Sequence, residues 1–248
     1  MSLSVVILTK NEQENITDCI KSVKFANEII IIDDNSTDKT IQIARKQGAK
    51  IFERSLNGDF AAQRNFGLNK VTSKWVLFLD ADERVSRQLA EEISQALNDS
   101  FVAASGFYVR RQDFLWRKPL KYGEVGNIKF LRLALKKAGQ WQRKVHETYK
   151  VSGRVKALKY PINHYPHQDI KVFLEHINFW SSLHADANWL EGKRSNLAKI
   201  IFMPIAHFVK NYFFKLGFLD GMSGFVFALI MSFHSFLAWG KIWTKQQK

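Results

Sequence analysis

Cysteine is almost absent from this chain of 248 residues, which contains Cys19 and no other cysteine. A single cysteine excludes an intramolecular disulfide framework and a zinc site built from cysteines. A signal peptide is not expected, because the opening residues MSLSVVILTKNE have neither a basic start nor a long apolar run. The sequence therefore predicts a cytoplasmic protein with one large domain or two small ones.

Two common phosphate-binding motifs are also missing. No GxGxxG follows the first apolar run, and no GxxxxGK[ST] occurs anywhere in the chain. Their absence disfavours a Rossmann dinucleotide site and a P-loop.

Positive charge is abundant but uneven. The net charge is +14, and residues 101–160 hold 15 Lys and Arg against three acids, whereas residues 1–100 are slightly acidic. Residues 193–248 form a second basic block. Such a surface suits nucleic acid, anionic lipid or a phosphorylated substrate.

Strand and helix patterns alternate through the first hundred residues. Short apolar runs that are typical of buried strands lie at 4–8, 28–32, 50–53 and 75–79. Helices are expected over 15–25, from the N-cap residues 35–37 to 47, over 60–68, and from about 86. This order predicts an α/β fold with a doubly wound, mostly parallel sheet.

The pattern changes in the second half. Strands are expected at 106–111 and 128–133, and a helix over 170–189. We therefore expect an α/β domain over residues 1–165 and a helical region over residues 166–248.

A polar cluster follows each of three predicted strands. The clusters are Thr9–Glu12, Asp33–Asn35 and Asp80–Glu83. Ligands of such sheets lie at the carboxyl ends of the strands, so the three clusters are expected to converge on one crevice.

The triplet Asp80-Ala81-Asp82 suggests a metal site. Two carboxylates one residue apart can share a hard cation such as Mg²⁺ or Mn²⁺, or divide between a metal and a ribose. The alternative is a polar turn before the helix that begins near Ser86. His164 is a candidate to touch the metal or a diphosphate, with a simply packed histidine as the alternative.

Four ordered segments resemble glycosyltransferase family 2, which comprises inverting enzymes with a GT-A fold. They are residues 4–12 (SVVILTKNE), 30–38 (IIIDDNSTD), 61–67 (AAQRNFG) and 75–83 (WVLFLDADE). Val145-His146-Glu147, Gly217–Gly221 and Gly224-Phe225 resemble the lipopolysaccharide-core glucosyltransferase-like branch of that family.

The resemblance implies roles for individual residues. Asp82 is implied as a metal ligand and Asp80 as a contact of ribose or metal. Asp34, with Asp33, is implied to hold the nucleotide base. The full nucleotide pocket implied by the match is Thr9, Asn11, Glu12, Asp33, Asp34, Arg64 and Asp80.

Glu147 is the candidate catalytic base. Direct displacement at a sugar carbon needs a carboxylate that takes the proton of the attacking hydroxyl. Residues 101–160 contain only three acids, and Glu147 alone follows a histidine and matches the family branch. Glu124 is the reserve, and a salt-bridged surface glutamate is the alternative interpretation of Glu147.

The C-terminal segment 198–243 is rich in Phe, Ile, Leu and Trp with interspersed lysines. Its longest clean apolar stretch, 225–237, is shorter than the ~20 residues that a spanning helix needs. We expect two amphipathic helices in a membrane interface. A buried helical hairpin and a single span are the alternatives.

The sequence thus predicts a metal-dependent inverting glycosyltransferase, peripheral on the inner face of the cytoplasmic membrane. It would use Mn²⁺ or Mg²⁺ to transfer one sugar from a nucleotide-diphosphate sugar, with a UDP-sugar favoured. The acceptor would be a hydroxyl of a membrane glycolipid, with lipopolysaccharide core favoured. A polyprenyl-phosphate sugar transferase is the nearest alternative. A basic nucleic-acid-binding protein is another, but the acidic crevice argues against a nucleic-acid partner.

Overall fold

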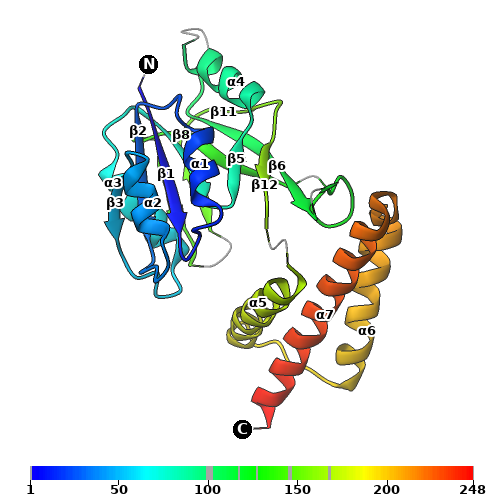
Figure 1. Ribbon diagram of the computed structural model, residues 1–248. Helices are drawn as coiled ribbons and strands as arrows, with labels where there is room; N and C mark the ends of the chain where they lie inside the picture. The colour runs from blue at the N-terminus through cyan, green and yellow to red at the C-terminus, as the bar shows by residue number, and fades with distance from the viewer. Residues whose placement is uncertain are drawn as a thin grey trace. The chain divides into compact units, whose positions relative to one another are not determined.

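The structure, a computed structural model, divides into two compact units (Figure 1). It describes residues 2–98, 103–116, 118–126, 128–144, 147–166 and 169–247. The sheet unit comprises Met1–Arg111 and Ile128–His164, and the helical unit comprises Gln112–Asn127 and Tyr165–Lys248. The helical unit therefore includes a segment, Gln112–Asn127, that the expected division at residue 165 assigns to the α/β domain. We call this segment the strap.

The sheet unit is built on four parallel strands in the order β3-β2-β1-β4. β8 then pairs antiparallel with β4, and β6 pairs antiparallel with β8. A separate antiparallel pair is formed by β9 and β10. The strands are β1 Leu3–Thr9, β2 Glu28–Asp33, β3 Lys50–Glu53, β4 Trp75–Asp80, β5 Glu83–Val85, β6 Gly106–Leu115, β7 Lys118–Pro119, β8 Lys129–Leu135, β9 Gly139–Gln142, β10 Thr148–Val151, β11 Val155–Ala157 and β12 Ile162–His164.

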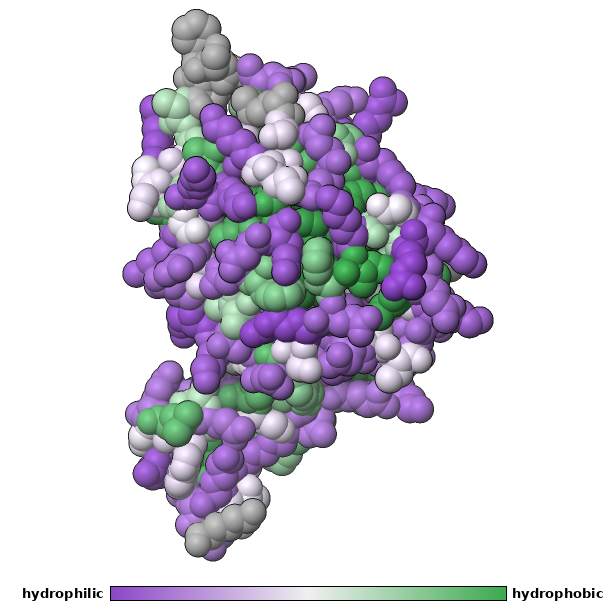
Figure 2. Space-filling model, turned by 90° about the vertical axis from the view of Figure 1, so that its left-hand side faces the viewer, coloured by the Kyte–Doolittle hydropathy of each residue, from purple (hydrophilic) through white to green (hydrophobic). Residues whose placement is uncertain are grey.

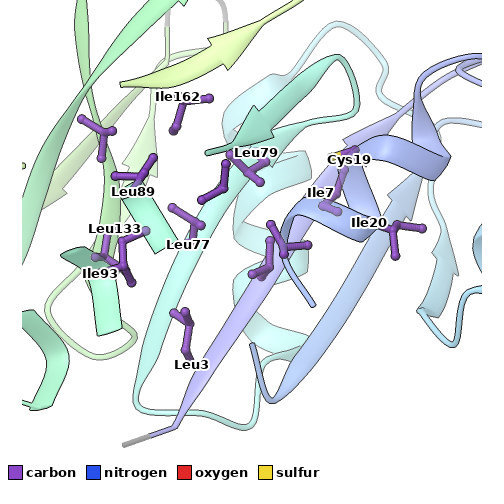
Figure 3. Packing of buried hydrophobic residues seen from close by; sticks show 14 of the residues in the cluster. Leu3, Ile7, Cys19, Ile20, Leu77, Leu79, Leu89, Ile93, Leu133 and Ile162 are labelled. Atoms are coloured by element: carbon purple, nitrogen blue, oxygen red, sulfur yellow. The ribbon is translucent and has the colours of Figure 1, made fainter. Parts of the chain in front are cut away.

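Hydrophobic clusters cover both faces of the parallel sheet. Successive side chains of a strand point to opposite faces, so each strand contributes residues to both clusters. Val5 and Ile7 of β1 pack in one hydrophobic cluster with residues of α1, α2 and α4, part of which Figure 3 shows. Val6 and Leu8 pack in a second cluster with α3 and β9. The helices are α1 Ile16–Ser22, α2 Thr40–Lys46, α3 Phe60–Lys70 and α4 Arg87–Asn98. The predicted doubly wound, mostly parallel α/β sheet is confirmed.

The expected start of α2 is wrong by several residues. The helix begins at Thr40, and its N-cap is Lys39 rather than a residue of 35–37. Ser36 and Thr37 instead bond to the loop after β1, and Asp38 accepts a hydrogen bond from the Thr40 backbone N–H. The expected helix beginning near Ser86 is confirmed, since the Ser86 hydroxyl accepts from the Leu89 N–H.

The helical unit contains three long helices. They are α5 Ile170–Leu190, α6 Leu197–Val209 and α7 Gly221–Gln246. A π-helical turn, Lys210–Phe214, and a 3₁₀ turn, Gly217–Asp220, connect α6 to α7. Gly217–Gln246 is long and apolar enough to cross a membrane by length and composition, and an 18-residue window of it has a mean hydropathy of 1.6. α7 begins at Gly221, so Gly221 and Gly224 do not interrupt this helix, contrary to the prediction from the sequence.

The strap is fastened to the connection between α6 and α7. Asp220 accepts hydrogen bonds from the backbone N–H groups of Lys121 and Tyr122. Glu124 accepts from the Asn211 side chain and lies 3.0 Å from His207 Nε2. The helical unit is therefore assembled from two separate parts of the chain.

Candidate active site

The ends of the three central strands lie side by side, as the sequence predicts. Thr9 is in register with Asp33, and Leu8 is in register with Asp80. The loops are also bonded to each other, because the Asn11 N–H donates to Ser36 Oγ and the Thr37 N–H donates to Asn11 Oδ1. Asn11 has a positive φ of 53°, a conformation that asparagine tolerates better than most residues.

Asp33 and Asp34, implied as contacts of the base, hold loops in place. Asp33 is fully buried and accepts from the N–H and the hydroxyl of Ser36. Asp34 accepts from the Leu56 N–H at 2.8 Å and from Lys10 Nζ at 2.8 Å. Both carboxylates thus fix the rim of the site.

Asp80 is held by two arginines. Arg64 Nη2 donates to its Oδ1 at 2.8 Å, and Arg132 Nη2 donates to its Oδ2 at 2.9 Å. Burial alone would raise the pKa of Asp80, but the two guanidinium groups outweigh it and hold this pKa below its usual value. Both oxygens of Asp80 therefore have protein partners.

Arg132 is the functional residue that sequence reasoning missed. It lies in the middle of β8, is 5% exposed, and its Nη2 also donates to Glu83 Oε1 at 3.0 Å. Glu83 in turn accepts from the Asp80 N–H. An arginine inside the apolar run LRLAL was the available signal, because an unpaired charge is not tolerated on a buried strand.

Asp82 differs from Asp80 because one of its oxygens is available. His164 Nε2 lies 3.1 Å from Asp82 Oδ2. Oδ1 is buried and has no hydrogen-bond partner among the described residues. Burial alone would raise the pKa of Asp82, but His164 outweighs it and lowers this pKa.

Glu12 lies close to these carboxylates. Burial, with the nearby charge of Asp82, raises its pKa to about 7. The Glu12 N–H donates to Thr40 Oγ1, and Asn15 donates to its carboxylate. Thr9 is buried, and its hydroxyl has no partner among the described residues.

Glu147, the candidate base, accepts from Arg64 Nε at 2.9 Å, and its side chain is 16% exposed. The cation that pairs with Glu147 is therefore Arg64. Val145 and His146 lie outside the described residues. Glu124, the reserve base, belongs to the helical unit.

The guanidinium of Arg64 thus contacts two carboxylates, Asp80 and Glu147. Arg64 is 2% exposed, rests 4.9 Å from the centroid of the Trp141 ring, and contacts both Asp80 and Glu147. Its Nη1 has no partner among the described residues. The site thus contains three kinds of group. Asp82 pairs with His164 and keeps one oxygen without a partner among the described residues, the guanidinium of Arg64 is buried, and Glu147 offers a second carboxylate.

Comparison with known proteins shows the family of the chain. Residues 4–160 match the family model described as glycosyl transferase family 2. The chain is 29% identical to the lipopolysaccharide core biosynthesis glycosyltransferase LpsC of Rhizobium meliloti, over 99% of this chain and 93% of that protein. It is 30% identical to an uncharacterized glycosyltransferase of Rickettsia felis, over 97% of this chain and 89% of that protein.

Among solved structures, the chain is similar to S. aureus TarS 1–349, with a TM-score of 0.48 and 15% identity. The match covers 73% of this chain and 65% of that one.

Proposed function

The chain belongs to glycosyltransferase family 2, and on that premise we propose that it transfers one sugar, with inversion, from a nucleotide-diphosphate sugar to a hydroxyl of a membrane glycolipid. It is a transferase whose sheet unit has a GT-A-like fold. The observation that carries the proposal is the pairing of Asp82 with His164 at the strand edge, beside a fully bonded Asp80.

A divalent cation fits the donor set at Asp82. Mn²⁺ accepts oxygen and nitrogen ligands, which the buried, unpartnered Oδ1 of Asp82 and the imidazole of His164 would supply. Mg²⁺ would bind the Asp82 carboxylate and the diphosphate oxygens of the nucleotide sugar. A bound cation would neutralise the charge that develops on the departing diphosphate. Asp80, with both oxygens bonded to arginines, is better suited to orient the site than to bind the metal.

The nucleotide would lie along the rim formed by the loops after β1 and β2. Thr9 and Asp33 end the two strands, Asn11 and Asp34 follow them, and the two loops are bonded to each other. The unpartnered hydroxyl of Thr9 and the unpartnered Nη1 of Arg64 supply a polar contact and a positive charge for the donor. A UDP-sugar is the favoured donor.

Glu147 would take the proton of the acceptor hydroxyl. Its ion pair with Arg64 holds the carboxylate in place, and a positioned carboxylate can act as a general base. Arg64 also contacts Asp80. The same side chain would therefore position both Glu147 and the carboxylate beside the nucleotide sugar.

Similarity to LpsC supports a glycolipid acceptor of the lipopolysaccharide core class. A lipid acceptor requires access to a membrane, and the basic blocks at 101–160 and 193–248 suit an anionic lipid surface. We place the protein on the cytoplasmic side, where nucleotide sugars are available.

Ligand-dependent thermal stability tests the donor site, since a ligand that binds only the folded state raises its stability. We expect UDP-sugars with Mn²⁺ or Mg²⁺ to raise the melting temperature of the wild-type chain and not of Asp82→Asn. The matched control is Asp18→Asn, the same change at an exposed position of α1. A full metal-dependent shift in Asp82→Asn would remove Asp82 from the ligand set.

A further inference from the structure

Exposed apolar side chains are concentrated in the helical unit. Of the large hydrophobic residues that are exposed in the described parts of the chain, all except Phe25 and Tyr108 belong to this unit. Soluble proteins rarely expose apolar patches of this extent, and such patches mark contact surfaces.

Helix α6 shows the feature most clearly. Its sequence, LAKIIFMPIAHFV, is apolar on nearly every side, yet Pro204 is its one buried residue. Phe202 is 65% exposed and Ile205 is 55% exposed. A helix that is hydrophobic all round belongs in a protein core or in lipid, and α6 is not in the core of this chain.

Helix α7 places large residues outward and small residues inward. Met222, Phe225, Leu229, Phe233 and Phe236 are exposed along one face. The buried face carries a small residue at every fourth position: Gly224, Ala228 and Ser232. Small residues at helix contacts with large ones outside are typical of helices packed in a membrane.

The inward face is closely packed. A Cβ added at Gly224 would lie 2.0 Å from the Gly217 carbonyl oxygen, so no larger residue fits there. Ser232 donates its hydroxyl to the Pro204 carbonyl at 2.8 Å, which joins α7 to α6. The helices are therefore a fixed pair, and their exposed apolar residues are not the product of a loose fit.

Helix α5 is mixed in character, because it exposes apolar side chains such as Leu174 and Phe179 together with charged ones. Its exposed residues include Glu175, His176 and Asp186, and Asp186 pairs with Lys245 of α7. Figure 2 views the molecule from the side on which α5 is the foremost long helix, and the lower part of that view is mainly hydrophilic with scattered hydrophobic side chains. The exposed charges of α5 suit water, and the exposed apolar residues of α6 and α7 suit hydrocarbon.

We propose that α6 and α7 lie in the acyl layer of a single membrane leaflet, with α5 on the aqueous side. This extends the membrane attachment of the proposed function from a surface contact to immersion. A transbilayer α7 is disfavoured, because α5 packs along it and would carry Glu175 and Asp186 into the hydrocarbon.

Lysines in and beside α6 and an apolar groove in the helical unit both suit immersion in one leaflet. Lys199, Lys210 and Lys215 flank the apolar residues of α6 and of the turn after it, where they can meet lipid phosphates. An apolar groove of about 400 Å³, lined by Leu174, Pro204 and the Leu229–Phe236 face of α7, has room for part of an acyl chain.

Single-cysteine labelling tests the proposal directly. Cys19 is fully buried, and burial raises the pKa of its thiol, so it should remain unlabelled in the folded chain. An environment-sensitive fluorophore is placed at Phe202→Cys and Phe233→Cys. The matched controls are Glu175→Cys on α5 and Phe25→Cys in the sheet unit. Each protein is added to vesicles of anionic phospholipid with brominated acyl chains.

We expect the labels at residues 202 and 233 to lose most of their fluorescence in brominated vesicles, and the labels at 175 and 25 to keep theirs. High salt should not reverse the quenching. Replacing Phe202 and Phe233 by serine should weaken partitioning roughly tenfold or more for each side chain, given the apolar area withdrawn from lipid.

Three results would overturn the proposal. Unquenched labels at 202 and 233 exclude immersion, and release by high salt shows attachment by charge alone. Labels at 202 and 233 that are already shielded without lipid, in a chain that sediments as a dimer, assign the face to a second copy. No result depends on sugar transfer, so failure here is distinct from failure of the proposed enzymatic function.

Discussion

At the scale of single residues, the site is organised by two buried arginines rather than by its acids. Arg64 and Arg132 each donate to a different oxygen of Asp80, and each reaches a second carboxylate, Glu147 or Glu83. Breaking a buried ion pair leaves an uncompensated charge, which costs more than the pair itself contributes.

Arg132→Met is therefore expected to lower the free energy of unfolding by about 3 kcal/mol. Adding Glu83→Gln removes the carboxylate that loses its only arginine partner, since Asp80 keeps Arg64, and should recover part of this loss. Arg87→Met, at a surface arginine with 90% side-chain exposure, should change stability little. Urea denaturation of the four proteins measures this, and an Arg132→Met chain as stable as wild type would contradict the account.

Glu28 makes the free energy of unfolding depend on pH. Its carboxylate is buried and accepts from Ser4, Lys50 and Thr72; burial opposes ionisation, but these partners lower its pKa from 4.5 to about 2. Because the folded pKa is the lower one, the stabilisation is complete above the unfolded value of 4.5 and is lost as the pH falls toward 2.

Glu28→Gln should therefore lower the free energy of unfolding by about 2 kcal/mol at neutral pH, and the difference from wild type should shrink between pH 4.5 and pH 2. Denaturant titrations across that range measure it. The exposed Glu14→Gln serves as the control. A difference that is constant with pH would show that the charge of Glu28 is not what stabilises the fold.

At the scale of elements, the strap is the feature that joins the two parts of the helical unit. Asp220 accepts hydrogen bonds from two backbone N–H groups of the strap. Glu124, in the strap, accepts one from the Asn211 side chain and contacts His207. These contacts hold Glu124 within the helical unit, and its reserve role as the base stays a prediction.

Asp220→Ala should leave the N–H groups of Lys121 and Tyr122 without acceptors and destabilise the helical unit by about 1–2 kcal/mol. The strap should then be cut faster by trypsin after the exposed Lys121, as limited proteolysis with mass spectrometry will show. Asp186→Ala on α5 is the control. Equal cleavage rates in all three proteins would mean that Asp220 does not hold the strap.

Strand periodicity located the elements well, because buried parallel strands read as apolar runs that loops interrupt. The predicted strand at 50–53 matches β3, and the predicted helix at 170–189 lies within one residue of α5. The start of α2 could not be foreseen, since Ser36 and Thr37 bond across to Asn11 instead of capping their own helix. Local sequence does not report such a distant partner.

At the scale of the whole molecule, the chain combines a polar site on a sheet with an apolar helical unit. Strand topology explains why Asp33, Asp80 and Asp82 could be grouped from sequence, because parallel strands bring their carboxyl ends to one edge. The pairing of Arg64 with Glu147, 83 positions apart, could not be read from any local pattern. The strap was missed for the same reason, since its partners lie about 100 positions further along the chain.

The central claim is that this site moves a sugar from a nucleotide with Glu147 as the base. The most direct measurement is the rate of UDP release from a UDP-sugar in the presence of a lipopolysaccharide-core acceptor, for the wild-type chain, Glu147→Gln and Glu124→Gln, with donor dissociation constants measured alongside. We predict that Glu147→Gln slows turnover by about 10²–10⁴-fold, the usual contribution of a positioned base, with donor affinity nearly unchanged. Near-normal turnover in Glu147→Gln, with a collapse in Glu124→Gln, would contradict the account.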